Sequence, residues 1–522
     1  MLFNSYSFLF LFLPVALLGF FKISSYSYRL GAVWLTAASL FFYGWWNPAY
    51  LVLLVGSIVF NYSIGVALTR KQERGRQTLS KAILAFGISA NLALLTYYKY
   101  AGFFLDNLQG VLGSGWEIGK IILPLGISFF TFTQITFLVD AYRGEVREYD
   151  FIHYSLFVTY FPHLIAGPIL HHKEMMPQFA KTETYKATYK NMAIGLTVLA
   201  IGLFKKVVLA DSIAPFAQTV FEAASRGQTL TFVEAWVGAI SYTLQIYFDF
   251  SGYSDMAIGL SSLFGIKLPL NFYSPYQAVN IIEFWRRWHI TLSRFLRDYL
   301  YIPLGGNRKG SVRRYANLMM TMLLGGLWHG ANWTFVVWGA LHGLFLFVNN
   351  LWRAIRRKLG HDFVQSTWWG RVTARTITFT AVVFAWVFFR AGSIGAAIGV
   401  FRGMTGLNGV VLPREWLSHS GSVGKWMSNH GMLFGVTPAI TRALNGPFLI
   451  VCLMAIVWFL PNTQQMMGKF KPALEVYRYA SRNFWRWLLW MPSWQWAIGS
   501  ALMMTCSIVM LDKVSEFLYF QF

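Results

Sequence analysis

His329 is the residue whose type and surroundings point most directly to chemistry. It lies in the apolar, glycine-rich run 323–333, within a stretch long enough to cross a membrane. Ionisable side chains are costly in such segments and usually mark a functional site. A desolvated imidazole is neutral and able to accept a proton, so the position predicts a general base. The alternative is a histidine that only hydrogen-bonds across a helix interface.

A second histidine, His289, lies upstream among tryptophans and arginines. If residues 284–299 form one helix, their aromatic and leucine side chains fall within an arc of about 120°. Four arginines then take the opposite side, with His289 at the boundary. One interpretation is an amphipathic helix at the membrane surface, with tryptophans at headgroup depth. The other is a basic face that meets a phosphorylated donor while His289 faces inward, and the two are compatible.

The composition determines the class of protein. The 522 residues are 56% hydrophobic and 12% charged, with a mean hydropathy of +0.46. Such a chain cannot bury its apolar residues in a soluble core, so we expect an all-α polytopic membrane protein. The net charge of +23 comes from short basic clusters between apolar spans, which favours a positive-inside bias over nucleic-acid binding. Neither the spacing of Cys452 and Cys506 nor any HExxH-like motif indicates a metal site.

Apolar runs alternate with short polar segments along the chain. Those at 152–170 and 230–264 are interrupted by Gly, Pro or charge, and we expect them to be re-entrant or bent around a cavity. We treat residues 1–522 as a single integral-membrane domain. The expected spans are 4–21, 30–46, 49–68, 82–105, 119–140, 152–170, 190–210, 230–264, 316–350, 371–391, 447–461 and 494–518.

The loops predict an orientation. Basic residues gather between Arg70 and Lys81 and again between Arg353 and Lys358, whereas 106–117 contains no Lys or Arg. The basic loops are expected in the cytoplasm. Counting spans from there places the N-terminus in the periplasm, and the first span is expected to be retained. The polar segment 403–446 is expected to be an external excursion whose role the sequence does not indicate.

Six motifs carry a family resemblance. They are FPHLIAGP at 161–168, QIYFDFSGYSDMA at 245–257, NF and PY at 271–276, EFWRRWHITLS at 283–293, RDYLYIPLGGN at 297–307 and LWHG at 327–330. With these motifs the chain resembles the membrane-bound O-acyltransferase family, and more narrowly its bacterial AlgI-like branch. The resemblance extends from the N-terminus to about residue 350, with a family core at about 120–350.

The resemblance implies a bundle of about eleven transmembrane helices, with re-entrant and interfacial helices, around a tunnel. It further implies a bacterial inner-membrane enzyme that passes acetyl groups from cytoplasmic acetyl-CoA to a periplasmic acceptor, with no permanently bound cofactor. The acceptor is expected to involve a periplasmic SGNH-type acetyltransferase that modifies an exopolysaccharide. Alginate is the first expectation, and cellulose and peptidoglycan are the alternatives.

The family motifs also suggest roles for individual residues. His329 is expected to deprotonate a hydroxyl in the tunnel, while His289 or Asn332 holds the thioester or the developing oxyanion. The basic residues are expected to grip donor phosphates, with lipid headgroups as the alternative ligand. The candidates for donor binding are Asn332, Trp285, Arg286, Arg287, Arg294, Arg297 and Lys309. The candidates for structural or tunnel-lining roles are His163, Asp249, Asp255 and Asn271.

Two other classes of protein fit a chain of this kind. A transporter of a saccharide or lipid-linked intermediate can also contain buried charges and broken helices. Transporters usually show paired halves, and the pattern from Gly252 to His329 occurs once in the sequence. A passive membrane scaffold would not need a histidine at position 329. Both features favour the enzyme.

Overall fold

The computed structural model describes residues 1–73, 76–113, 119, 121–146, 150–360, 367–414, 421–430, 433–435, 446–474, 487–511 and 517–518. Parts of the predicted external segments 106–117 and 403–446 lie outside the described residues. The chain forms two compact units. Unit 1 contains Met1–Phe204, Gly252–Asn271 and the described residues from Thr463 onward, and unit 2 contains Lys205–Ser251 and Phe272–Asn462. A single membrane domain stays a prediction.

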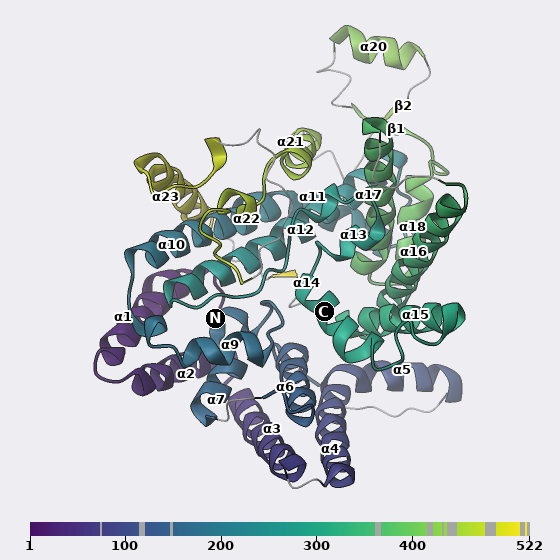
Figure 1. Ribbon diagram of the computed structural model, residues 1–522. Coiled ribbons are helices and arrows are strands. Elements are labelled where there is room, and N and C mark those ends of the chain that lie inside the picture. Colours follow the sequence, from purple (N-terminus) through teal and green to yellow (C-terminus); the bar gives the residue numbers. More distant parts are fainter. Residues whose placement is uncertain are drawn as a thin grey trace. The chain divides into compact units, whose positions relative to one another are not determined.

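Unit 1 is helical wherever it has regular structure among its described residues. Its first segments include short π-helical turns, η1 and η2, that continue directly into α-helices. Helices α1 to α9 of this unit are drawn in purple to blue in Figure 1. Its elements are η1 Ser7–Phe12, α1 Leu13–Ser24, α2 Tyr28–Gly44, α3 Ala49–Glu73, α4 Gln77–Leu95, η2 Thr96–Tyr100, α5 Ala101–Leu112, α6 Ile127–Tyr142, α7 Phe151–Thr159, α8 Phe161–Leu164, α9 His172–Phe179, η3 Thr182–Tyr185, α10 Tyr189–Phe204, α22 Thr463–Met466 and α23 Trp494–Val509.

Unit 2 is also mainly helical and contains one small parallel strand pair, in which Val411 faces Leu433. Helix α12, Phe232–Leu263, begins in unit 2 and ends in unit 1. The other elements of unit 2 are η4 Lys205–Ala210, α11 Asp211–Ser225, η5 Pro275–Gln277, α13 Ile281–Trp285, α14 Ile290–Phe295, η6 Leu296–Tyr301, α15 Gly310–His329, α16 Trp333–Lys358, α17 Trp368–Arg390, α18 Ile394–Met404, β1 Val411–Pro413, α20 Gly421–Asn429, β2 Leu433–Gly435 and α21 Gly446–Phe459.

Several helices begin at a residue whose side chain accepts a hydrogen bond from a backbone N–H of the first turn. This arrangement satisfies donors that have no partner inside the helix. The capping residues are Ser27 for α2, Asp150 for α7, Asn332 for α16, Thr367 for α17 and Ser393 for α18. The helix starts are therefore encoded locally, by short polar side chains placed directly before apolar runs.

The chain is a multi-pass membrane protein. Within the described residues, six helical segments are long and apolar enough to cross a bilayer. They are Ser7–Ser24, Ala49–Lys71, Gln77–Leu112, Tyr189–Ser225, Trp333–Lys358 and Trp368–Arg390. The predicted all-α polytopic class is confirmed, whereas the count of about eleven crossings stays a prediction.

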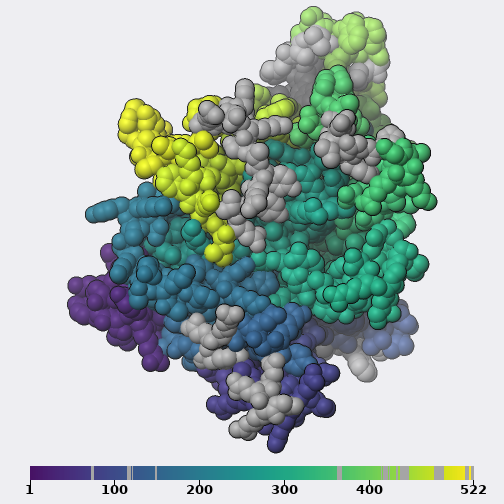
Figure 2. Space-filling model, in the orientation of Figure 1, coloured from purple at the N-terminus to yellow at the C-terminus, as the bar shows by residue number. Residues whose placement is uncertain are grey.

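Large apolar side chains remain exposed on the outer faces of helices. On α23, which forms part of the surface in yellow (Figure 2), Trp494, Leu502 and Val509 are 70%, 60% and 67% exposed. Contiguous apolar surface of this kind is unfavourable in water and favourable against lipid tails. The packing of α23 thus agrees with a membrane environment.

The predicted interruption of 230–264 is wrong, because α12 is one uninterrupted helix of 32 residues. Its glycines allow close packing instead of breaking the helix. A Cβ on Gly259 would lie 2.6 Å from the backbone nitrogen of Leu199, and a Cβ on Gly202 would lie 2.7 Å from the carbonyl oxygen of Gly252. Helices α10 and α12 therefore approach backbone to backbone within unit 1. By contrast, the predicted interruption of 152–170 is confirmed by the separate helices α7 and α8.

The predicted span 316–350 consists of two helices, α15 and α16, that lie side by side (Figure 1). A Cβ on Gly326 would lie 2.2 Å from the carbonyl oxygen of Phe335, and one on Gly339 would lie 2.3 Å from that of Met322. A Cβ on Gly330 would meet the Phe335 ring at 2.1 Å. The space beside Gly326 and Gly330 is therefore occupied by the neighbouring helix.

Candidate active site

His329 is the last residue of α15, directly before the extended backbone of Gly330. Its side chain is buried, with the residue 5% exposed. The centroid of its ring lies 4.9 Å from that of Trp328, 5.0 Å from Trp338 and 5.1 Å from Phe389. These rings come from α15, α16 and α17, so the packing of three helices places the imidazole in apolar surroundings.

His289 is brought next to His329 by a break in the helix predicted over 284–299. The chain forms α13, a turn, α14 and η6 instead, so the prediction of one helix is wrong. His289 lies in the turn with φ 41° and ψ 55°, a left-handed conformation that is unfavourable for a residue with a Cβ. Residues held in this conformation tend to cluster at functional sites. The backbone nitrogen of Tyr273 donates to the carbonyl oxygen of Arg287 at 2.9 Å and fixes the turn.

The two imidazoles face a shared apolar environment. The His289 ring lies 4.9 Å from the Phe250 ring and 6.5 Å from the His329 ring, between centroids. A direct hydrogen bond needs about 3 Å between the donor and acceptor atoms. Two imidazole rings whose centroids are 6.5 Å apart do not bring their nitrogen atoms that close. The arrangement leaves each ring able to contact a different atom of one small reacting group. It is therefore suited to acid–base chemistry on a substrate.

Burial keeps His289 neutral. The residue is 0% exposed and lies outside the six candidate spans, and desolvation lowers its pKa from 6.5 to about 3. In the unfolded chain the pKa returns to its usual value. Between pH 6.5 and about pH 3 the unfolded state binds more protons than the folded state. The stability contributed by burying neutral His289 is therefore present above pH 6.5 and is lost as the pH falls.

This linkage predicts the effect of His289→Phe. The variant keeps an aromatic ring but cannot take up a proton in the unfolded state. We expect its melting temperature in detergent to fall less steeply than that of the wild type between pH 6.5 and about pH 4. Above pH 7 the two curves should run parallel. Equal slopes in the acid range would contradict the burial of a neutral His289.

The aromatic residues of 284–299 pack inside unit 2. Phe284, Trp285 and Trp288 are 1%, 9% and 1% exposed. The Trp288 ring lies 4.9 Å from the Trp386 ring and 5.0 Å from the Phe272 ring. The sequence pattern therefore identified a buried apolar face correctly. Its partner is protein, so the predicted placement of these tryptophans at headgroup depth is wrong.

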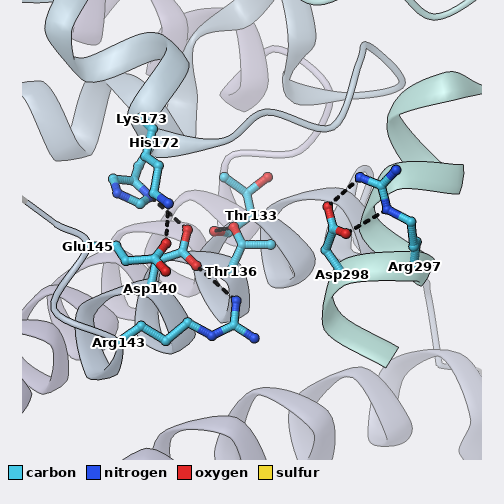
Figure 3. A network of polar contacts seen from close by, with 9 residues as sticks. All are labelled: Thr133, Thr136, Asp140, Arg143, Glu145, His172, Lys173, Arg297 and Asp298. Atoms are coloured by element: carbon cyan, nitrogen blue, oxygen red, sulfur yellow. Dashed lines mark hydrogen bonds and ion pairs between the residues drawn. The ribbon is translucent and has the colours of Figure 1, made fainter. Parts of the chain in front are cut away.

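The basic candidates differ in their surroundings. Arg286 is exposed, whereas the Arg287 guanidinium contacts the Glu283 carboxylate and its side chain is 11% exposed. Arg297 pairs with Asp298 through its Nε atom at 2.7 Å, as Figure 3 shows. Arg294 is half-buried on α14, and Lys309 is exposed directly before α15. Arg286 and Lys309 thus have the exposure that an electrostatic contact with a soluble anion requires.

Asn332 caps α16 and bonds to the segment between α17 and α18. Its Oδ1 accepts from the backbone nitrogen of Thr334 at 3.0 Å, and its Nδ2 donates to the carbonyl oxygen of Gly392 at 3.2 Å. The amide therefore helps to hold the segment that follows His329. Its predicted contact with a thioester or oxyanion stays a prediction.

Asp249 belongs to a buried ion-pair network in unit 2. The Nζ atom of Lys206 lies 2.7 Å from Asp249 and 2.8 Å from Asp211. The side chains of Lys206 and Asp249 are each 2% exposed. The network links η4, α11 and α12. The structural or tunnel-lining role expected of Asp249 stays a prediction.

The remaining candidates lie in unit 1. The Nε2 atom of His163 donates to the carbonyl oxygen of Phe157 at 2.9 Å, and the residue is 2% exposed. Asp255 accepts from the hydroxyl of Thr463 at 2.6 Å, and Asn271 is 0% exposed. All three are buried polar groups, and the structural or tunnel-lining roles expected of them stay predictions.

A further polar cluster in unit 1 had no predicted role. The Nδ1 atom of His172 lies 3.2 Å from Asp140, whose other carboxylate oxygen lies 3.7 Å from Arg143 (Figure 3). The cluster joins the end of α6 to the start of α9. Across the residues that the structure describes, no group of three or more His, Cys, Asp or Glu side chains is arranged to hold a metal ion.

Sequence reasoning missed two buried residues of unit 2. His342 on α16 is 0% exposed and lies 4.7 Å from Trp338, between ring centroids, so it shares a neighbour with His329. Lys206 is the centre of the ion-pair network. Both are ionisable residues within apolar runs, which is the same signal that singled out His329.

Comparison with known proteins identifies the family. Residues 125–389 match the model of the MBOAT, membrane-bound O-acyltransferase family. The chain is 47% identical over 439 residues to a peptidoglycan O-acetyltransferase of Helicobacter pylori, covering 79% of this chain and 81% of the relative. It is 44% identical over 409 residues to a probable alginate O-acetylase AlgI of Pseudomonas aeruginosa, covering 77% and 75%.

A more distant relative is a teichoic acid D-alanyltransferase of Bacillus subtilis, 28% identical over 278 residues, which cover 52% of this chain and 69% of the relative. The matched region of the family model contains α6 to α17 and both histidines, His289 and His329. The extent of the match and the identity to relatives covered over most of their length leave one conclusion. This chain belongs to the membrane-bound O-acyltransferase family and is an O-acyltransferase.

Proposed function

We propose that the protein transfers acetyl groups from cytoplasmic acetyl-CoA across the bacterial inner membrane to a periplasmic acceptor, for the O-acetylation of an exported polysaccharide. The observation that carries the proposal is the pairing of His289 and His329 in an apolar site of unit 2. Neutral imidazoles in such surroundings suit proton transfer during attack of a hydroxyl on a thioester. The relatives named as O-acetyltransferases support acetyl as the transferred group.

In the proposed reaction His329 acts as the general base. It takes the proton of the acceptor hydroxyl as the oxygen attacks the thioester carbonyl, and returns that proton to the departing thiolate when the C–S bond breaks. His289, on the other side of the reacting group, donates to the developing oxyanion. The aromatic rings around His329 exclude water, which strengthens these interactions and limits hydrolysis of the thioester.

In the proposed complex the donor's phosphates contact the exposed side chains of Arg286, which precedes α14, and Lys309, which precedes α15. For Arg286→Glu we expect the KM for acetyl-CoA to rise by about threefold to tenfold, because a charge-assisted hydrogen bond is replaced by repulsion. The increase should shrink in high salt. Arg287 is a poor choice for this test because its reversal would also disrupt the contact with Glu283.

The matched control for this prediction is Arg371→Glu, the same charge change on an exposed arginine of α17. Its KM for acetyl-CoA should equal that of the wild type. If Arg286→Glu leaves the KM unchanged while weakening association with anionic lipid vesicles, the ligand of Arg286 is a lipid headgroup and the proposed donor contact is wrong.

The acceptor is proposed to be a carbohydrate hydroxyl reached through a periplasmic SGNH-type partner. Alginate was the first expectation, and the similarity to an alginate O-acetylase supports it. Peptidoglycan is the second candidate, because a peptidoglycan O-acetyltransferase is similar over a comparable share of the chain. The lower identity to the teichoic acid D-alanyltransferase favours acetyl over D-alanyl transfer.

Inside-out membrane vesicles supplied with labelled acetyl-CoA test the proposed function. The proposal expects label on a protein or polymer inside the vesicle, since the acetyl group crosses and the CoA does not. Vesicles loaded with alginate or with peptidoglycan fragments, each with the candidate partner, then distinguish the two acceptors. Absence of label from the vesicle interior with every acceptor would overturn the proposal.

A further inference from the structure

Three side chains of unit 2 contact one another one helical turn beyond the His329 site. The His342 ring lies 5.1 Å from the Trp285 ring and 4.7 Å from the Trp338 ring, and the two indoles are 5.8 Å apart, between centroids. The three residues are 0%, 9% and 1% exposed. We call Trp285, Trp338 and His342 the indole–imidazole cluster. Its members come from α13 and α16.

The cluster contains four buried polar atoms that form no hydrogen bond with the described part of the protein. They are Nδ1 and Nε2 of His342 and the Nε1 atoms of Trp285 and Trp338. Buried polar groups are nearly always hydrogen-bonded, because an unmet donor or acceptor in apolar surroundings is destabilising. Four such atoms on three mutually contacting side chains therefore point to a polar group outside the described part of the protein.

The chemistry of that group follows from the atoms that face it. Two indoles supply two N–H donors, and a neutral imidazole supplies one N–H donor and one acceptor nitrogen. A carbonyl oxygen has two lone pairs and accepts from two of the three donors, and an amide N–H satisfies the imidazole acceptor nitrogen. A secondary amide therefore pairs with three of the four atoms and leaves one N–H donor for a second acceptor, whereas a carboxylate has no donor for the imidazole nitrogen.

We propose that the indole–imidazole cluster binds an amide of the pantetheine arm of the acyl donor, an inference that rests on the proposed acyl-thioester donor. Trp338 contacts both His329 and His342. In a pantetheine thioester, two methylene groups separate the sulfur from the nearest amide. A thioester at His329 would thus place its amide beside the next ring along α16.

The orientation predicted for α16 agrees with this path. The helix ends in Arg356, Arg357 and Lys358, a basic end expected in the cytoplasm. His342 lies four residues closer to that end than Trp338, about 6 Å along the helix axis. The arm of a donor entering from the cytoplasm would pass His342 before its thioester meets His329.

His342→Phe tests the proposal because it keeps a ring and removes both nitrogens. With acetyl-CoA, we expect the KM to rise by about fivefold to tenfold, the effect of losing one or two hydrogen bonds, while kcat changes little. The melting temperature should be equal to or higher than that of the wild type. His342→Gln, which restores a donor and an acceptor, should recover part of the donor affinity.

Truncated donors separate binding of the amide from packing. The rise in KM should persist with the acetyl thioester of N-acetylcysteamine, which keeps the nearest amide, and vanish with S-butyl thioacetate, which has none. Phe345→Leu is the packing control, since Phe345 contacts His342 at 5.8 Å without a polar atom. Acetyl-CoA and an acetylated carrier protein present the same arm, so wild-type rates with each identify the source of the donor.

Each outcome assigns the result to one hypothesis. If the wild type transfers acetyl from none of these thioesters, the proposed function fails. If the wild type is active and His342→Phe leaves the KM for acetyl-CoA unchanged, the amide site is wrong. If His342→Phe raises the KM for S-butyl thioacetate as much as the KM for acetyl-CoA, the proposed amide site is also wrong. A lowered melting temperature with an unchanged KM would mean that a structural water holds the imidazole.

Discussion

His329→Ala is expected to abolish acetyl transfer while the protein still inserts and folds. A positioned general base contributes about 10²-fold to 10⁴-fold to a reaction rate, and alanine offers no proton acceptor. The ring lies at the end of α15 among rings from three helices, so its removal leaves a cavity without breaking a helix. The measurement is labelled acetyl transferred per folded molecule in vesicles.

The control for His329→Ala is His430→Ala, which removes an exposed histidine of the same unit. That variant should keep the wild-type rate. His329→Phe provides a second check, because it refills the cavity and restores packing without restoring a base. A rate close to that of the wild type in either His329 variant would eliminate the general-base assignment, whatever the effect on stability.

Lys206→Met is expected to be the most destabilising of the substitutions considered. The ammonium group lies within 2.8 Å of both Asp249 and Asp211, and the Lys206 and Asp249 side chains are each 2% exposed. Without the lysine, two carboxylates face each other in buried surroundings. Breaking a buried ion pair from one side costs about 3–5 kcal/mol, far more than the net worth of the intact pair. Denaturation in mixed detergent micelles measures the loss.

The double variant Lys206→Met with Asp249→Leu is the matched comparison. It removes the most deeply buried carboxylate together with its partner, and we expect it to recover most of the lost stability, since apolar replacements of buried pairs are often nearly neutral. If the double variant is stable but inactive, Asp249 takes part in the reaction. If it is stable and active, the network serves only to join η4, α11 and α12.

Local sequence patterns were sufficient for the class of protein, and they singled out two histidines that the structure brings close together. Composition alone requires a membrane environment, since no soluble core could bury this many apolar residues. His289 and His329 were singled out because an ionisable group in an apolar run is energetically costly and usually has a function. Short polar residues directly before apolar runs coincide with helix starts in the structure, as at Asn332. Each of these signals acts over a few neighbouring residues.

The partner of each apolar face was decided only by the tertiary structure. Helical periodicity reports that one side is buried but does not distinguish lipid from protein. It therefore allowed an interpretation with Trp285 and Trp288 at headgroup depth, whereas both pack inside unit 2. Gly252 and Gly259 resemble helix breakers in sequence. In α12 they permit close contact with α10, and the packing gained there outweighs their low helix propensity.

The geometry of the site likewise depends on contacts between residues far apart in the chain. The left-handed backbone at His289 breaks the helix that its neighbours favour, and rings from α12 and α15, which are distant in the sequence, pack against it. Residue types and spacing therefore determined which groups are available for catalysis. Only the packing of distant segments determined which of these groups lie close together. The free energy that stabilises the unfavourable backbone at His289 comes from such long-range contacts, which a local sequence pattern does not show.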